Sequence, residues 1–164
     1  MKISTHRFYL RELTENDVGS RYLSWLQDKE TAEFITYKQK NLDELTLYVK
    51  TNLLAKDVLF LGVFCKCTDE HIGNLKFDKI INHSAVMGVL IGQANWRGCG
   101  VATEILPASI EYLYREMNID SVYLGVERDN TPAISVYDKV GFLPCTNQPF
   151  SLGDNGLAMV HRFL

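Results

Sequence analysis

The chain has 164 residues, the length of one ordinary domain, with 46% hydrophobic and 23% charged residues. This composition is typical of a globular protein, and the formal net charge of -3 argues against a nucleic-acid-binding surface, which is usually markedly basic. No window approaches the roughly 18 apolar residues of a membrane-spanning helix, and residues 1–7 lack the apolar stretch of a signal peptide. We therefore expect one cytoplasmic domain over residues 1–164, with neither a membrane nor a nucleic acid as partner.

The first half of the chain predicts a strand, two helices and a hairpin. Residues 7–13 alternate in polarity as a strand does, and residues 15–34 carry apolar side chains at helical spacing. The helical spacing returns over residues 41–56. Residues 58–67 and 71–80 then predict two strands joined by a short polar turn.

The second half predicts three more strands after the apolar run of residues 85–92, interleaved with two helices. A helix is predicted over residues 101–117, a strand over 121–126 and a short helix that ends at Gly141. Two final strands follow across a polar loop, at residues 142–146 and 156–163. The order predicts an α+β domain around one mixed, seven-stranded sheet with about four helices.

The four cysteines and four histidines do not form a recognisable metal pattern. Cys65-Lys66-Cys67 has His71 nearby, but there is no second C-x-x-C or H-x-x-x-H pair. All four cysteines are expected to be free thiols in a reducing compartment. No metal site is predicted.

The segment Arg97-Gly98-Cys99-Gly100-Val101-Ala102 connects an apolar strand to an amphipathic helix. A glycine-rich turn of this kind can aim unpaired backbone N–H groups at a phosphate, with the positive end of the helix dipole behind them. The glycines match neither a P-loop nor the G-x-G-x-x-G of a dinucleotide site. We interpret the turn as a pyrophosphate site, with tight packing without a ligand as the alternative.

A second motif about thirty residues downstream strengthens this interpretation. This motif contains Asn130, Ala133, Tyr137, Gly141 and Phe142. These residues match the signature N-x-x-A-x-x-x-Y-x-x-x-G-F, and Arg97, Gly100 and Ala102 match the signature Q/R-x-x-G-x-G/A. The two motifs together resemble the GNAT superfamily of N-acetyltransferases, and in overall pattern its ribosomal-protein-acetyltransferase-like branch. The resemblance implies an enzyme that uses acetyl-CoA as co-substrate, with a sheet whose central strands splay apart.

The resemblance also implies which residues bind acetyl-CoA. Backbone groups at the end of the strand over residues 85–92 would pair with the pantetheine arm, and the glycine turn would hold the pyrophosphate. Asn130 would hold the pantetheine or the local turn, with a simple helix cap as the alternative. The implied cofactor-binding residues are Leu90, Ile91, Gly92, Arg97, Gly98, Cys99, Gly100, Val101, Ala102, Thr103, Asn130, Ala133 and Tyr137.

Tyr137 occupies the position of the family's general acid, which gives a proton to the departing thiolate. A tyrosine with a pKa of about 10 stays protonated at neutral pH and suits this task. The alternative is an aromatic ring that only packs. The sequence thus predicts transfer of an acetyl group to a primary amine by direct attack on the thioester, with a non-catalytic acyl-CoA-binding regulatory domain as the alternative.

The general base is not assigned by the sequence. Relatives often carry a carboxylate at the positions of Val86 or Gly125, and neither residue is acidic here. A lysine-like amine is neutral less than about one time in a thousand at pH 7, so deprotonation costs roughly 4 to 5 kcal/mol without a base. The open candidates are Glu127, Asp78, Glu33 and a chain of water molecules.

The acceptor amine is expected to bind between residues 25–37 and the loop over residues 147–156. Trp25, Phe34 and Tyr37 are the candidate substrate-binding residues, with core packing as the alternative for these aromatic side chains. A peptide amino terminus or an amino sugar is favoured as acceptor over a polyamine or another small amine. The sequence leaves the oligomeric state open, with a homodimer as one alternative.

Overall fold

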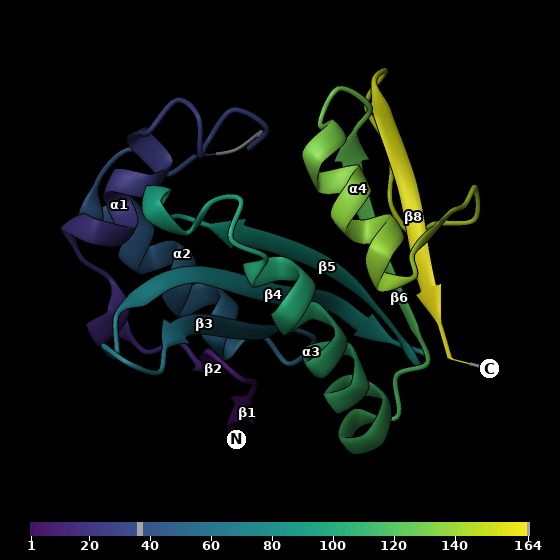
Figure 1. Ribbon diagram of the computed structural model, residues 1–164, viewed down its shortest axis with the longest axis horizontal. Coiled ribbons are helices and arrows are strands. Elements are labelled where there is room, and N and C mark those ends of the chain that lie inside the picture. The colour runs from purple at the N-terminus through teal and green to yellow at the C-terminus, as the bar shows by residue number, and fades with distance from the viewer. Residues whose placement is uncertain (36–37, 164) are drawn as a thin grey trace.

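The computed structural model describes residues 1–35 and 38–163 (Figure 1). The described strands form one eight-stranded sheet in the order β1-β2-β3-β4-β5-β6-β8-β7. All neighbouring strands are antiparallel except β5 and β6, which are parallel. The bounds are β1 Ile3–Ser4, β2 Phe8–Glu12, β3 Leu59–Cys65, β4 His71–Ile81, β5 Ser84–Ile91, β6 Ser121–Glu127, β7 Leu143–Pro144 and β8 Gly156–Arg162.

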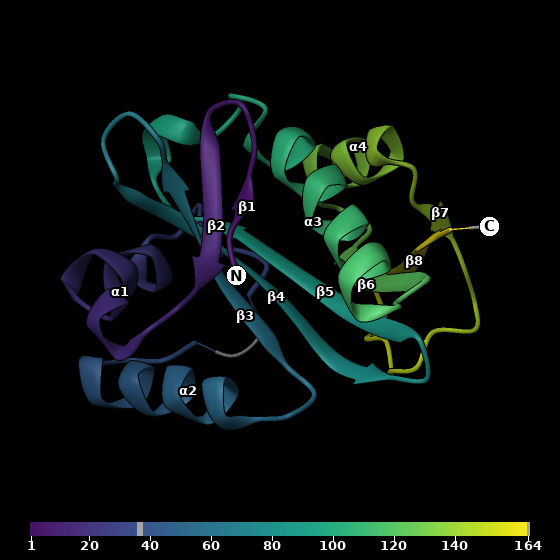
Figure 2. The ribbon, with the colours of Figure 1, turned by 90° about the horizontal axis from the view of Figure 1, so that it is seen from below.

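Among the described residues, four α-helices cover the sheet, two on each face, as Figures 1 and 2 show. Helices α1 (Ser20–Gln27) and α2 (Leu42–Leu54) lie on one face, and α3 (Val101–Met117) and α4 (Thr131–Val140) lie on the other. Short 3₁₀ turns precede α1 and α3, at Glu15–Asp17 and Ala94–Trp96. The predicted α+β class, the mixed sheet and the helix number are confirmed.

The helix boundaries follow capping residues that the sequence supplies. The Asn41 side chain accepts a hydrogen bond from the backbone N–H of Glu44 at 2.9 Å and starts α2. Asn130 caps α4 in the same way through the N–H of Ala133. Gly141 ends α4 with φ of 108°, a left-handed conformation that a residue with a side chain rarely adopts.

The core consists of two hydrophobic clusters separated by the sheet. Strand β3 is buried along its whole length because its side chains alternate between the two clusters. The larger cluster lies under α3 and α4 and includes Phe8, Leu61, Phe77, Ile105, Leu106 and Phe142. The smaller lies under α1 and α2 and consists of Leu13, Tyr22, Trp25, Leu26, Leu45, Val49 and Phe60, with partly buried neighbours. Each such side chain contributes about 1.5–3 kcal/mol when it is fully buried.

Two expectations about the secondary structure are corrected. The helix predicted over residues 15–34 is wrong at both ends: Glu15–Asp17 is a separate 3₁₀ turn followed by extended Val18 and Gly19, and α1 ends at Gln27. It ends there because Asp28 is extended and its carboxylate accepts from the Glu30 N–H and the Thr31 hydroxyl. Such local side-chain hydrogen bonds compete with a continuing helix. The eighth strand is β1, which pairs only Ile3 and Ser4 with β2 and is too short for a visible alternation pattern.

The central strands β5 and β6 pair over only three residues each. Ser84–Val86 pairs with Ser121–Tyr123, and beyond these residues β5 stays with β4 while β6 stays with β8. Figure 1 shows the two strands diverging toward the end of β5. The expected splay of the central strands is therefore present, and it opens the sheet between its two halves.

Candidate active site

A cleft with a volume of about 870 Å³ opens where β5 and β6 diverge. Its walls come from β5, β6, the start of α3, the inner side of α4, and residues 30–35 and 150–153. Most of the candidate residues from the sequence line it, namely Phe34, Leu90, Ile91, Arg97, Gly98, Gly100, Val101, Ala102, Thr103, Asn130, Ala133 and Tyr137. Trp25, Gly92 and Cys99 do not line it, and Tyr37 lies outside the described residues.

The turn before α3 presents a row of free backbone donors to this cleft. Gly98 and Gly100 have φ of 69° and 76°, and Gly100 is the N-cap of α3. Within the described chain, no hydrogen-bond acceptor lies at the N–H groups of residues 98–103, whereas the Arg97 N–H already donates to the Ala94 carbonyl at 3.2 Å. The first turn of α3 therefore offers donors and a positive dipole end to an anion, beginning at Gly98.

The turn is held from behind by the chain between β1 and β2. The Glu104 carboxylate, in the first turn of α3, accepts from the backbone N–H and the Nε of Arg7 and from the Thr5 hydroxyl, each at 2.7 Å. Partial burial opposes ionisation of Glu104, but these hydrogen bonds prevail and lower its pKa. Arg7 Nη2 also donates to the Cys99 carbonyl at 2.9 Å. Cys99 thus contributes its backbone to the turn, while its side chain lies outside the cleft.

Strand β5 supplies the long wall of the cleft. After Val86, no described strand pairs with the edge of β5 that faces β6, so backbone groups up to Ile91 face the opening. An extended ligand arm can pair with such an edge as an additional strand does. The open edge leads directly to the donor row before α3, so one long molecule with a phosphate end fits both.

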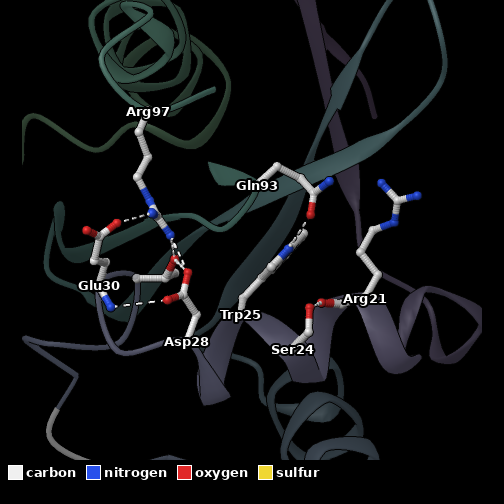
Figure 3. Close-up of polar contacts among 8 residues, drawn as sticks. Arg21, Ser24, Trp25, Asp28, Glu30, Gln93 and Arg97 are labelled. Atoms are coloured by element: carbon white, nitrogen blue, oxygen red, sulfur yellow. Dashed lines mark hydrogen bonds and ion pairs between the residues drawn. The ribbon is translucent and has the colours of Figure 1, made fainter. Parts of the chain in front are cut away.

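Gly92 and Trp25 lie together just outside the cleft. A Cβ atom at position 92 would lie 1.9 Å from the Trp25 ring, so only glycine allows this ring to pack against the backbone. Trp25 is 2% exposed, and its indole N–H donates to Gln93 Oε1 at 2.8 Å (Figure 3). The Gly92 N–H donates to the Ile72 carbonyl. Trp25 is therefore a core residue that supports the end of β5.

Tyr137 enters the cleft from α4, across from β5. Burial raises the pKa of its phenol to about 12, and no described residue forms a hydrogen bond with its hydroxyl. The ring packs against Phe142, with 5.8 Å between the ring centroids. Tyr137 therefore presents an un-ionised phenol to the cleft, and its ring is held by Phe142.

Two of the three candidate carboxylate bases line the cleft. Glu33 approaches from the segment after α1, and Glu127 ends β6. Asp78 does not line the cleft; its Oδ2 lies 3.4 Å from Lys76 Nζ on the same strand. Glu33 and Glu127 thus remain candidates for the general base, whereas Asp78 forms an ion pair with Lys76 outside the cleft.

The position of Gly125 has an aromatic neighbour that sequence reasoning missed. A Cβ atom at Gly125 would lie 3.2 Å from the Phe150 ring, and Phe150 and Leu152 both line the cleft. The sequence indicated the loop over residues 147–156 but not which side chain turns inward. Phe34, which is 40% exposed, lines the cleft from the segment after α1. The wall of the cleft opposite the glycine turn therefore combines aromatic side chains with the carboxylates of Glu33 and Glu127.

The Arg97 side chain reaches the segment after α1, as Figure 3 shows. Its Nη2 lies 2.6 Å from Asp28 Oδ2, and its Nη1 lies 2.8 Å from Glu30 Oε2. Nη2 also donates to the Thr31 hydroxyl. A hydrogen bond from the Thr31 hydroxyl, and further bonds from the Glu30 N–H and Arg97, lower the pKa of Asp28.

Other kinds of site are not found among residues 1–35 and 38–163. No group of three or more His, Cys, Asp or Glu side chains is placed to hold a metal ion, and Cys65, Cys67, Cys99 and Cys145 are free. None of the helices described has both the length and the apolar character required to cross a bilayer.

Several curated proteins are similar to this chain in sequence, and two of them are described here. The chain is 33% identical over 83 residues to the "Uncharacterized N-acetyltransferase p20" of Bacillus licheniformis, which covers 49% of this chain and 46% of that protein. It therefore spans less than half of that relative. It is 23% identical over 143 residues to an N-alpha-acetyltransferase of Saccharolobus solfataricus, covering 71% of this chain and 85% of that protein.

Solved structures share the fold. A spermidine N-acetyltransferase from Vibrio cholerae, in complex with CoA and spermine, has a TM-score of 0.80 at 19% identity and covers 95% of both chains. A ribosomal-protein-S5-alanine acetyltransferase from Vibrio fischeri has a TM-score of 0.80 at 11% identity, covering 99% of this chain and 96% of that one. The sequence profile of the "Acetyltransferase (GNAT) domain" matches residues 7–143. The chain therefore belongs to the GNAT family of acetyltransferases, as the two motifs predicted.

Proposed function

We propose that this protein is an acetyl-CoA-dependent N-acetyltransferase that transfers an acetyl group to a primary amine by direct attack on the thioester. The observation that carries the proposal is the row of free N–H groups at residues 98–103, which opens onto the same cleft as Tyr137. A phosphate site alone would serve any nucleotide. The open edge of β5 between these two features fits a long thiol-bearing arm.

The chain's own residues then divide the work of acyl transfer. The donor row at the start of α3 binds the pyrophosphate, and the backbone edge of β5 orients the arm that carries the thioester. Tyr137 holds its proton across the neutral pH range, because its raised pKa keeps the phenol un-ionised, and gives the proton to the departing thiolate. Holding both reactants in one cleft removes most of the entropic cost of bringing them together.

The acceptor is an amine whose own pKa is low, because neither Val86 nor Gly125 provides a base. An α-amino group, with a pKa of about 8, is easier to deprotonate than a lysine side chain by roughly 3 kcal/mol for the difference of about 2.4 pKa units. Peptide amino termini or amino sugars should therefore outrank lysine side chains and polyamines. The printed name of the archaeal relative, an N-alpha-acetyltransferase, agrees with an α-amino acceptor.

A polyamine is the second candidate acceptor. Glu30, Glu33 and Glu127 line the cleft, and carboxylates attract a polycation. The Vibrio cholerae neighbour that contains spermine shares the fold but only 19% of the sequence, so it supports the fold alone.

The test is a panel of acceptors at about pH 7 with detection of the released thiol. The panel contains a peptide with a free amino terminus and no lysine, an amino-terminally blocked lysine peptide, glucosamine and spermidine. The highest kcat/KM is expected for the peptide amino terminus or glucosamine, and a highest value for spermidine or the lysine peptide would refute the preference. Tight acetyl-CoA binding with no turnover on any amine would favour the non-catalytic acyl-CoA-binding alternative.

A further inference from the structure

The backbone and the side chain of Arg97 lie beside two different segments of the chain, which are far apart in the sequence. Its backbone precedes the donor row of residues 98–103, and its side chain lies against Asp28 and Glu30 (Figure 3). Asp28 and Arg97 are 69 residues apart. One residue thus connects the cofactor turn with the segment after α1.

That segment is the acceptor-side wall of the cleft. Residues 30–35, with the exception of Ala32, line the cleft, and Phe34 is exposed to it. The segment has no regular secondary structure and few backbone hydrogen bonds of its own, among them Ala32 N–H to Asp28 and Ile35 N–H to Ala32. Its position therefore depends strongly on side-chain contacts at its start.

We propose that Arg97 is a positioning residue that holds residues 28–31 against the cofactor turn and so places the acceptor wall. The inference rests on the proposed function for its kinetic consequence. It assigns the guanidinium to the acceptor side, whereas the backbone N–H groups that follow Arg97 serve the phosphate.

The geometry favours this role over direct phosphate binding by the side chain. Both terminal nitrogens of Arg97 contact carboxylates, at 2.6 Å and 2.8 Å, and Nη2 also contacts the Thr31 hydroxyl. The guanidinium is thus already neutralised by two acidic partners. Its fixed fork suits two partners at once, which a lysine ammonium on a flexible stem does not reproduce.

A second contact holds the start of the same turn against α1, the helix that precedes this segment. The Trp25 indole donates to Gln93, and the Gln93 amide donates to Glu70 Oε1 at 2.7 Å. The turn between β5 and α3 is therefore attached to α1 at its start and to the segment after α1 at its end. Arg97 is the contact that reaches the segment lining the cleft.

The experiment compares Arg97→Gln and Asp28→Asn with a matched control. Asp28→Asn removes the charge that faces Arg97 but keeps one acceptor oxygen, which can still accept from the Glu30 N–H; the amide NH₂ that replaces Oδ2 no longer accepts from the Thr31 hydroxyl or from Arg97. The control is Arg115→Gln, which removes an exposed ion pair with Glu111 on α3; neither residue lines the cleft. Three quantities are measured: amide hydrogen exchange over residues 28–35 in the free protein, the Kd of acetyl-CoA, and the KM and kcat for the best acceptor.

In Arg97→Gln we expect exchange over residues 28–35 to become about five- to tenfold faster, the size expected for two partly exposed ion pairs, and in Asp28→Asn, which removes one of the two, about two- to fivefold faster. The acceptor KM should rise by a similar factor, while kcat and the Kd of acetyl-CoA change less than about twofold. The double variant should be no worse than Arg97→Gln alone, because the ion pair that Asp28→Asn removes is already absent in Arg97→Gln. Arg115→Gln should leave all of these quantities unchanged.

The proposal is overturned if exchange over residues 28–35 is unchanged in Arg97→Gln. It is also overturned if Arg97→Gln weakens acetyl-CoA binding strongly and Asp28→Asn does not, since Arg97 would then be a phosphate ligand. If the wild-type protein acetylates no amine, the proposed function fails, while the exchange measurement on the free protein still decides the role of Arg97.

Discussion

Two substitutions of Gly100 can separate the effect of an added charge at the proposed phosphate site from the effect of an added side chain. A Cβ atom at this position would meet only Arg7 Nη2, at 3.7 Å, so a short side chain has room. The left-handed φ of 76° is tolerated by Asn and Asp better than by other residues with side chains. Gly100→Asn and Gly100→Asp therefore carry a similar backbone strain and differ mainly by one negative charge.

That charge would lie beside the free N–H groups of residues 98–103. Two like unit charges about 4 Å apart repel by about 1 kcal/mol in bulk water and by about 4 kcal/mol near a protein surface, where the effective dielectric constant is lower. These energies correspond to an increase in Kd of roughly 5-fold to several hundred-fold. Arg7 partly compensates the new carboxylate, so we expect a value in the lower half of this range. Added salt should narrow the difference between the two variants.

The assay is calorimetric titration of both variants with acetyl-CoA, after thermal unfolding has established that both are folded. We expect Gly100→Asn to bind within about tenfold of the wild type and Gly100→Asp to bind more weakly than Gly100→Asn by the factor above. If the Asp and Asn variants bind acetyl-CoA with equal affinities that are both near the wild-type value, the proposal that this turn binds the pyrophosphate is refuted.

Three further predictions concern catalysis, stability with pH, and packing. Tyr137→Phe should lower kcat by about 10²- to 10⁴-fold with little change in the Kd of acetyl-CoA, and an equal loss of both would assign the ring to packing. Burial lowers the pKa of the His71 imidazole, so the unfolded chain binds a proton at this residue more readily than the folded protein does. The free energy of unfolding should therefore decrease as the pH is lowered from about 7.5 to about 5.5, and it should decrease less steeply in His71→Gln. The same pH dependence in the wild type and in His71→Gln would contradict this prediction. Gly92→Ala should cost about 1–3 kcal/mol of stability in urea unfolding, because its methyl group collides with the Trp25 ring; a neutral result would mean that the ring moves freely.

The parts of the site that sequence predicted are those encoded by neighbouring residues. The left-handed glycines at 98 and 100, the Asn130 cap and the Gly141 end of α4 each depend on a few consecutive residues. Tyr137 was identified through the family resemblance, and it lies on the side of α4 that lines the cleft. The turn, the cap and the helix end could be predicted because each is encoded by residues that are close together in the chain.

For the opposite wall of the cleft, the sequence indicated the segments over residues 25–37 and 147–156 but not which of their side chains turn inward, because that depends on contacts between distant segments. Trp25 meets Gln93 across 68 residues, and Phe150 covers Gly125 from a loop without regular structure. Periodicity identifies an apolar face but not its partner. The end of α1 was missed for a related reason. Asp28 is a polar residue of the kind found on an exposed helix surface, and the sequence pattern does not show that its carboxylate accepts hydrogen bonds from the Glu30 N–H and the Thr31 hydroxyl, which end the helix.

Because the core is divided into two clusters, substitutions in one cluster should affect stability independently of substitutions in the other. The larger cluster supports α3 and α4, which carry the cofactor side, and the smaller supports α1 and the segment that follows it. Substitutions in separate clusters without shared partners add in their effects on free energy. Acceptor preference can therefore be altered through the smaller cluster in combination with changes on the cofactor side, and each combined effect can be calculated from the single ones. Pairs that include Arg97 should be the exception, since it belongs to both sides.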